Sequence, residues 1–230
     1  TLFGSAKGAL IQMAAIFAIG WVLLFSSVGL VVSKTIDAVT TLIGRYVAWL
    51  ILLAIIISTV NAIIRKLFDR SSNAWLEGQW VLFGAVFLLC ASWTLWSNEH
   101  IRIDIVNSRF SKRVRDWIDV LGHGVFLLPL TVIMTYHSWP FFTRSYAINE
   151  QSLNAGGLPQ WPSKFLVFAG FLVLFFQAVS ELIKRVAIMR GEMEDPHAGG
   201  GGHAAAAEAE AQRLLEVAEA EAARLAATKS

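Results

Sequence analysis

Two histidines in one apolar segment are the residues whose spacing most directly suggests chemistry. His123 and His137 are 14 residues apart, so on one helix they lie on nearly the same face, about 21 Å from each other. Stacked haems in membrane cytochromes use such a spacing, but on two helices. The other histidines, His100, His197 and His203, are not in the middle of an apolar segment, so a haem would need axial ligands from elsewhere. The simpler interpretation is that both rings lie near the ends of a membrane span, where their polar tips reach water.

Motifs for catalysis or tight metal binding are missing from the sequence. There is no Walker loop, no GxGxxG and no Ser/His/Asp constellation. Cys90 is the only cysteine, so neither an intrachain disulfide nor a Cys/His zinc cluster is expected. His197 and His203 flank four glycines, but two ligands alone do not form a metal cage. We therefore predict no enzyme activity, no catalytic residue, no metal and no cofactor.

The most charged stretch of the chain, Asn98 to Trp117, lies between two long uncharged segments. Val106, Phe110, Val114 and Trp117 within it recur at the three- and four-residue spacing of a helical apolar stripe. A short helix that is apolar on one face and basic on the other suits a membrane surface, where cations meet lipid phosphates. A solvated connecting loop is the alternative. The charged residues are Glu99, Arg102, Asp104, Arg109, Lys112, Arg113, Arg115 and Asp116.

Composition places the chain in a membrane. Of its 230 residues, 56% are hydrophobic and only 16% are charged, whereas about a quarter of the residues in an average soluble domain are charged. The net charge of +2 is small and forms no basic patch of the kind that nucleic acid requires. We therefore exclude nucleic acid as a partner.

Five uncharged runs are candidate spans, since a helix needs about 20 apolar residues to cross a bilayer. They are Gly8 to Ser33, Tyr46 to Ile64, Gly78 to Asn98, Val120 to Thr143, and Phe165 to Ser180. The predicted fold is an all-α integral membrane protein, a bundle of four to five transmembrane helices with an amphipathic surface helix between the third and fourth spans. Residues 1–33 would be an extra N-terminal transmembrane helix, which could instead lie partly in the interface. Residues 34–195 would be a four-helix domain, and residues 196–230 a flexible glycine linker and an Ala/Glu-rich tail.

Turn-forming and charged residues indicate how the spans connect. Lys34 to Arg45 is interpreted as a short linker, and Ser72 or Asn73 could cap the third span. Pro129 should kink the fourth span or be accommodated by a neighbour. Pro162, after a loop rich in Gly, Asn and Pro, fits the first turn of the last span.

The middles of the five runs contain no Asp, Glu, Lys or Arg. Because transporters place ionisable groups along their ion paths, the chain alone looks like a scaffold, although backbone carbonyls can also hold sodium. With five spans, ten Lys and Arg residues fall on one side and six on the other. The richer side, with the C-terminal tail, is predicted to be cytoplasmic.

Two stretches of the sequence form one distinctive pattern. The first comprises Trp75-Leu76-Glu77, then Asn98 to Val106 with its His-x-Arg-x-Asp, then Arg115 to Asp119. The second comprises Glu150-Gln151-Ser152 and Gly156-Gly157-Leu158-Pro159-Gln160-Trp161-Pro162, followed by Gly170-Phe171 and Gln177. Together they resemble the small membrane subunit of tripartite ATP-independent periplasmic (TRAP) transporters, the DctQ-like family, over about Arg45 to Arg190.

The resemblance implies a multi-pass protein of the bacterial inner membrane that scaffolds a large transport subunit. That partner would carry the sodium and substrate sites, and a periplasmic binding protein would deliver a dicarboxylate or 2-oxo acid. Phospholipids would contact the surface helix. The candidate partner or lipid contacts are Glu77, His100, Arg102, Asp104, Arg109, Arg113, Ser152 and Trp161. The alternative function is a haem- or quinone-binding membrane anchor of a respiratory complex.

Overall fold

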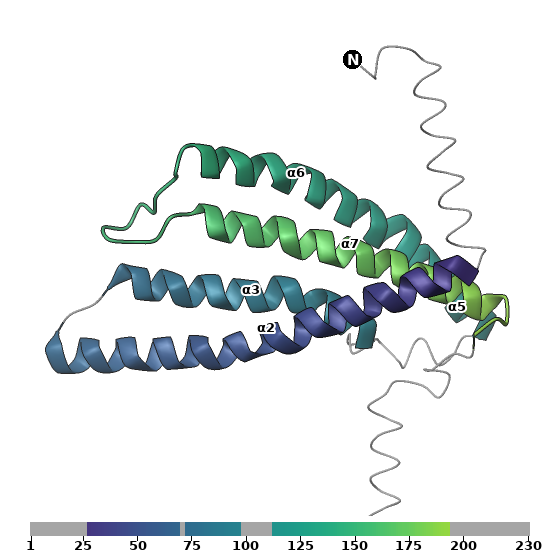
Figure 1. Ribbon diagram of the computed structural model, residues 1–230, viewed down its shortest axis with the longest axis horizontal. Helices are drawn as coiled ribbons and strands as arrows, with labels where there is room; N and C mark the ends of the chain where they lie inside the picture. Colours follow the sequence, from purple (N-terminus) through teal and green to yellow (C-terminus); the bar gives the residue numbers. More distant parts are fainter. Residues whose placement is uncertain (1–26, 70–71, 98–111, 194–230) are drawn as a thin grey trace, which may run out of the picture. The chain divides into compact units, whose positions relative to one another are not determined.

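A computed structural model describes residues 27–69, 72–97 and 112–193, and within these it contains helices and no strand beyond a single bridge between Gln151 and Pro159. The predicted all-α fold is therefore confirmed (Figure 1). Most of the first apolar run, the stretch 98–111 and the glycine linker and tail lie outside the described residues. The helices are α2 (Ser27–Phe68), α3 (Asn73–Ser97), α5 (Lys112–Leu121), the π-helix η1 (Gly122–Leu127), α6 (Leu128–Ala147) and α7 (Trp161–Met189).

Four helical segments in the described part are long and apolar enough to cross a membrane: Val28–Phe68, Asn73–Ser97, Arg113–Ala147 and Trp161–Met189. Their outer surface is rich in exposed large apolar side chains, whereas their fully buried side chains are mostly small and polar. Helices pack in lipid through small and hydroxylated residues, because burying apolar surface gains nothing where the solvent is itself apolar. The distribution of side chains is therefore that of a protein surrounded by lipid.

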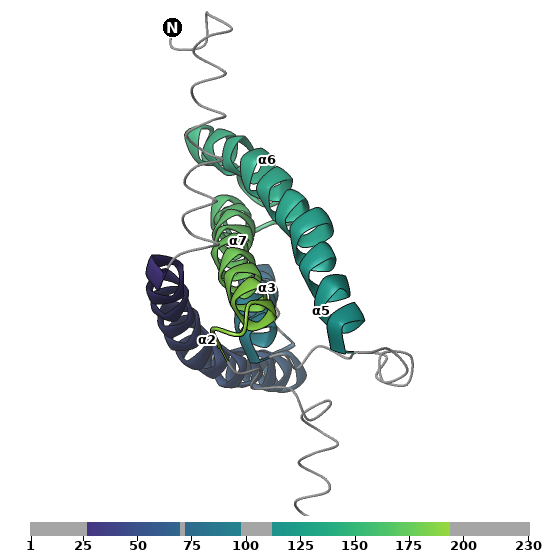
Figure 2. The same cartoon turned by 90° about the vertical axis from the view of Figure 1, so that its right-hand side faces the viewer.

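Helices α3 and α7 lie side by side, α6 packs on α7, and α2 packs on both α3 and α7 (Figures 1 and 2). α3 and α7 both begin next to the loop of residues 148–160, where Glu77 accepts a hydrogen bond from the backbone of Leu158. We call this end of the bundle the loop end and the other the far end. α2 and α6 end at the loop end, so the four spans alternate in direction.

Two glycines allow these helices to approach closely. A Cβ atom on Gly44 of α2 would lie 2.6 Å from Cγ of Trp93 in α3. A Cβ on Gly170 of α7 would lie 2.7 Å from Cβ of Leu88 in α3. Both distances are far below van der Waals contact, so each position admits only a residue without a side chain.

The linker predicted over Lys34 to Arg45 is wrong, because these residues belong to the uninterrupted helix α2. The 42 residues of α2 extend about 63 Å, roughly twice the thickness of a bilayer core. Charged residues interrupt the apolar run without interrupting the helix. Asp37 faces α7, where it has polar partners, while the side chains of Lys34 and Arg45 are exposed.

Pro129 is accommodated by a change of helix type and not by a neighbouring helix. It lies in the first turn of α6, directly after the π-helix η1. The N–H of Leu128 donates to the carbonyl of His123, five residues earlier. The wider π turn shifts the backbone hydrogen-bonding pattern by one residue, directly before Pro129, which has no N–H to donate.

The amphipathic helix predicted before the fourth span is described only from Lys112 onward. There α5 exposes Trp117, Ile118 and Leu121 and buries Asp116. α5, η1 and α6 follow one another without a break, so this part of the amphipathic segment leads directly into the span.

Candidate functional site

One carboxylate, that of Glu77 in the first turns of α3, organises the loop between α6 and α7. Its Oε1 accepts hydrogen bonds from the hydroxyl of Ser152 and, at 2.8 Å, from Nδ2 of Asn154. Its Oε2 accepts a hydrogen bond from the backbone N–H of Leu158 at 2.6 Å. Glu77 is 92% shielded from solvent, with a relative exposure of 8%, so the loop supplies most of the solvation that water would otherwise give.

The loop is shaped to surround this carboxylate. A Cβ on Gly157 would lie 2.7 Å from both oxygens of Glu77 and 2.6 Å from Cβ of Ser152, so a side chain there would displace the carboxylate. The N–H of Ser152 donates to the carbonyl of Leu158, which closes the loop across its base. Nδ2 of Asn73 in α3 donates to the carbonyl of Ala155 at 2.9 Å, which adds a second link between α3 and the loop and uses the side chain predicted to be a possible cap.

A second set of contacts fixes the two ends of the loop to α6 and α7. Glu150 forms an ion pair with Lys164, and the Lys164 ammonium lies 4.4 Å from the ring centroid of Phe141. The hydrogen bond from Lys164 holds the pKa of Glu150 below its ordinary value. Trp161 packs edge-on against Tyr146, with ring centroids 5.5 Å apart. Trp161 therefore anchors α7 to α6.

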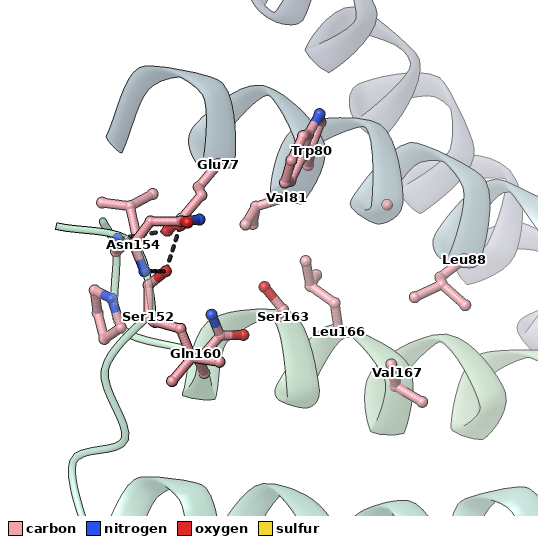
Figure 3. A pocket seen from close by; sticks show the side chains of 14 residues that line it. Glu77, Trp80, Val81, Leu88, Ser152, Asn154, Gln160, Ser163, Leu166 and Val167 are labelled. Carbon is pink, nitrogen blue, oxygen red and sulfur yellow. Dashed lines mark hydrogen bonds between the residues drawn. The ribbon is translucent and has the colours of Figure 1, made fainter. Parts of the chain in front are cut away.

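The loop forms the end wall of a groove of about 610 Å³ between α3 and α7 (Figure 3). Trp80 and Val81 line one side, and Leu166 and Val167 line the other. Leu153, between two residues that bond Glu77, also lines the groove and is fully exposed, with a relative exposure of 104%. A loop tied to Glu77 by hydrogen bonds thus presents an uncovered leucine beside a largely apolar groove.

A second groove of about 630 Å³ lies between α2 and α3. It is lined by Ile51, Ala54, Ile55, Ser58, Thr59, Gln79, Trp80, Phe83 and Gly84. Trp80 and Gly84 line both grooves, so they form the ridge between them. Trp80 is 65% exposed, and a Cβ on Gly84 would meet no atom within 4 Å. We call the face formed by the two grooves and this ridge the α3 face.

At the far end, a buried polar cluster joins α2 to α7. Oδ1 of Asp37 accepts hydrogen bonds from Ser180 at 2.7 Å and Gln177 at 2.9 Å. Oδ2 of Asp37 forms an ion pair with Lys184 at 3.0 Å. The hydroxyl of Ser33 lies 2.8 Å from that of Ser180. In addition, Arg185 of α7 pairs with Asp119 of α5 at 3.3 Å.

The structure brings together some of the predicted contact residues and separates others. Glu77 and Ser152 meet directly, and Trp161 lies in the same loop region on the side of α6. Arg113 is exposed in the first turn of α5. His100, Arg102, Asp104 and Arg109 lie outside the described residues, and no finding tests any of the eight residues as a partner or lipid contact.

Sequence reasoning missed the residues that complete both clusters. Asn154 appears in the sequence only as one of several turn formers, and nothing local indicates that its amide donates to Glu77, 77 residues away. The linker predicted over Lys34 to Arg45 gives Asp37 no partner, and Ser180 marks only the end of a predicted span. Gln177 was noted only as part of the family pattern.

The two candidate haem ligands do not form a metal site with the other described residues. Nδ1 of His123 lies 2.6 Å from the carbonyl of Asp119 within its own helical segment, and the ring of His137 packs edge-on against Tyr136. Among residues 27–69, 72–97 and 112–193, no three His, Cys, Asp or Glu side chains are grouped to hold a metal ion. The haem-anchor alternative gains no support from this geometry.

The described part of the chain has four apolar spans, an apolar outer surface and ion pairs that join one helix to another, which define a multi-pass helical membrane protein. A family model for the DctQ component of tripartite ATP-independent periplasmic transporters matches residues 54–187, more than half of the chain. The chain therefore belongs to this family and is a small membrane subunit of a TRAP transporter, a component that functions with a large membrane subunit and a substrate-binding protein. No curated protein and no solved structure matches it.

Proposed function

We propose that this subunit is a non-catalytic scaffold for the large subunit of a sodium-driven TRAP transporter that imports an organic acid, a dicarboxylate or a 2-oxo acid. It would lie in the bacterial inner membrane, with the loop end in the periplasm and the far end and the C-terminal tail in the cytoplasm. The bias of Lys and Arg toward the far end supports this orientation. Sodium and substrate would bind to the large subunit, after delivery of the substrate by the binding protein.

The observation that supports the scaffold role is how the charged groups within the spans are bonded. Glu77 is satisfied by its loop. Asp37 and Lys184 pair with each other across α2 and α7. Ionisable groups within spans often mark ion paths, whereas each of these is bonded to a neighbouring helix or loop. That use favours a rigid support.

The α3 face is the proposed seat for a helix of the large subunit. Gly84, a half-buried glycine whose added Cβ would meet no atom within 4 Å, lies between two apolar grooves. It lets a neighbouring helix approach closely, which is how helices associate in lipid. Trp80 beside it offers a large rigid side chain, of the kind that dominates binding energy at interfaces. Leu153 extends the same surface beyond the helices at the loop end. These contacts support a partner on this side of the bundle.

Transport in cells or vesicles tests the scaffold role. We expect sodium-dependent uptake of the organic acid to require this chain together with the large subunit and the binding protein. Reconstitution of this chain alone should give no solute flux. Undiminished uptake after deletion of this chain, or flux through it alone, would show that it is not a scaffold.

A single substitution tests the α3 face. Gly84→Leu adds a side chain where this chain has no atom within 4 Å of the new Cβ, so the subunit should fold normally and fail to seat its partner. Gly122→Leu is the matched control, because its Cβ also meets nothing within 4 Å but lies in η1. Co-purification with the large subunit should fall for the first variant only. Equal recovery of the complex for both variants would place the interface elsewhere.

A further inference from the structure

A small pocket of about 320 Å³ lies near the far end of the bundle, apart from the α3 face. Asp37, Ala38, Thr41, Leu42 and Arg45 of α2 and Trp96 of α3 line it. Its lining residues therefore carry one guanidinium, one carboxylate, one hydroxyl and one indole ring, together with apolar carbon. A cavity of this size suits a small polar group with an apolar attachment.

Helix geometry places this pocket at the level where a membrane surface must lie. Trp96 is 23 residues after the start of α3, and Arg45 is 23 residues before the end of α2. At 1.5 Å per residue each lies about 35 Å from the loop end, just beyond a hydrocarbon core of about 30 Å. Arg45 follows Gly44, which packs on Trp93, so direct packing confirms that the two helices are level here. Lipid head groups occupy this depth.

The part of α2 that precedes Arg45 does not continue straight away from the membrane. Lys184 is 23 residues after the start of α7 and therefore lies at about the same 35 Å level. It pairs with Asp37, which lies eight residues before Arg45 in α2. The segment from Asp37 to Arg45 consequently runs obliquely, close to the membrane surface. Val39 and Leu42 on this segment are at least half exposed, which suits contact with acyl chains.

The charged side chains of the pocket determine which lipid head group can bind there. The guanidinium of Arg45 is exposed and has no ion-pair partner among the described residues. A phosphodiester is the anion present at this depth, and it accepts charge-assisted hydrogen bonds from arginine.

Asp37, on the same rim, accepts hydrogen bonds from Ser180 and Gln177 at Oδ1 and pairs with Lys184 through Oδ2. Lys184 also pairs with Glu181, so two carboxylates share one ammonium group and the cluster keeps a negative charge. A carboxylate beside the phosphate site repels a second anion and attracts an ammonium group.

We propose that this pocket binds the head group of a zwitterionic phospholipid that carries a primary amine. The phosphodiester contacts Arg45 and the indole N–H of Trp96, the ammonium group contacts Asp37, and the acyl chains run along Leu42. Phosphatidylethanolamine is the lipid of this chemistry. The lipid would hold the oblique part of α2 against α3, next to the contacts that Asp37 makes with α7.

Native mass spectrometry of the full chain, purified in mild detergent, measures the bound lipid and identifies its head group. Incubation with an equimolar mixture of phosphatidylethanolamine, phosphatidylcholine and phosphatidylglycerol should give one dominant adduct, that of phosphatidylethanolamine. Arg45→Gln should lower the affinity for this lipid about tenfold, because one charge-assisted hydrogen bond is lost. Trp96→Phe, which keeps an aromatic ring and removes the N–H, should lower it by a smaller factor.

Arg65→Gln is the matched control, since Arg65 is an exposed arginine near the other end of the same helix. It should bind the lipid as the wild type does. Equal retention of lipid by Arg45→Gln and the wild type would overturn the proposal, and so would an equal loss in both arginine variants. Retention of phosphatidylglycerol at the level of phosphatidylethanolamine would overturn the assigned role of Asp37. Melting curves in lipid-free detergent show whether each variant is folded, so that loss of lipid is read only from folded protein.

Discussion

Replacement of Gly157 by alanine should release the loop from Glu77. The added methyl group would lie 2.7 Å from both carboxylate oxygens and 2.6 Å from Cβ of Ser152, roughly 1 Å inside normal contact distance. The loop backbone or the carboxylate must therefore move. Either movement lengthens the hydrogen bond from the Leu158 N–H, which is now 2.6 Å.

The size of the effect follows from the overlap. Forcing a methyl group into a filled site costs about 1–3 kcal/mol. For a chain of this length about 2 kcal/mol corresponds to a fall of roughly 4–8 °C in the apparent Tm. Thermal unfolding of the full chain in detergent measures this shift. Hydrogen exchange should show loss of protection at the amide of Leu158, since that amide is a donor to the carboxylate.

Gly78→Ala provides the control for this experiment. Its Cβ would lie 3.7 Å from Cδ1 of Leu158, an ordinary contact, and alanine favours a helix more than glycine does. Its apparent Tm should equal or exceed that of the wild type. If Gly157→Ala melted with the wild type and kept the Leu158 amide protected, the carboxylate would not be what holds the loop.

Three further substitutions test other contacts. Ser180→Ala removes a buried donor to the far-end carboxylate and should cost about 1 kcal/mol, measured as a lower apparent Tm. Gly44→Ala would place a methyl group 2.6 Å from the ring of Trp93 and should change the near-ultraviolet dichroism of that indole as α2 and α3 separate. Because the hydrogen bond from Lys164 lowers the pKa of Glu150 below its ordinary value of 4.5, this pair stabilises the fold above pH 4.5 and ceases to do so as the pH falls through the lowered pKa. Glu150→Gln should remove that acid-dependent part of the melting curve, and an unchanged pH dependence would contradict the assignment.

The spans of α3, α6 and α7 could be predicted because each is a run of apolar residues long enough to cross lipid. The length of α2 could not be predicted in the same way. Its charged residue Asp37 is tolerated because it pairs with Lys184, a residue 147 positions later in the chain. The hydropathy of one segment does not reveal a partner in a distant segment. The π turn before Pro129 could not be predicted either, since a proline shows only that the regular hydrogen bonding of the helix is interrupted, not how the helix adapts.

The loop cluster could be predicted only in part. Glu77 and Ser152 were both singled out, but 75 residues separate them, and nothing local shows that one bonds the other. Gly157 is part of the family pattern, but the sequence does not show why a glycine is needed there. The reason is the space that the Glu77 carboxylate occupies, which only a three-dimensional structure reveals. The charged stretch around Arg102 remains a prediction, because it lies outside the described residues.

The great length of α2 has a consequence for the membranes in which this subunit can work. Its slope is fixed at two points by other helices, through Asp37 at Lys184 and through Gly44 at Trp93. A single helix free to tilt adjusts to a thicker or thinner bilayer at little cost, but α2 cannot tilt alone without breaking an ion pair or opening a close packing contact. A change in bilayer thickness therefore acts on α2, α3 and α7 together, as a tilt of the whole bundle or a deformation of the surrounding lipid.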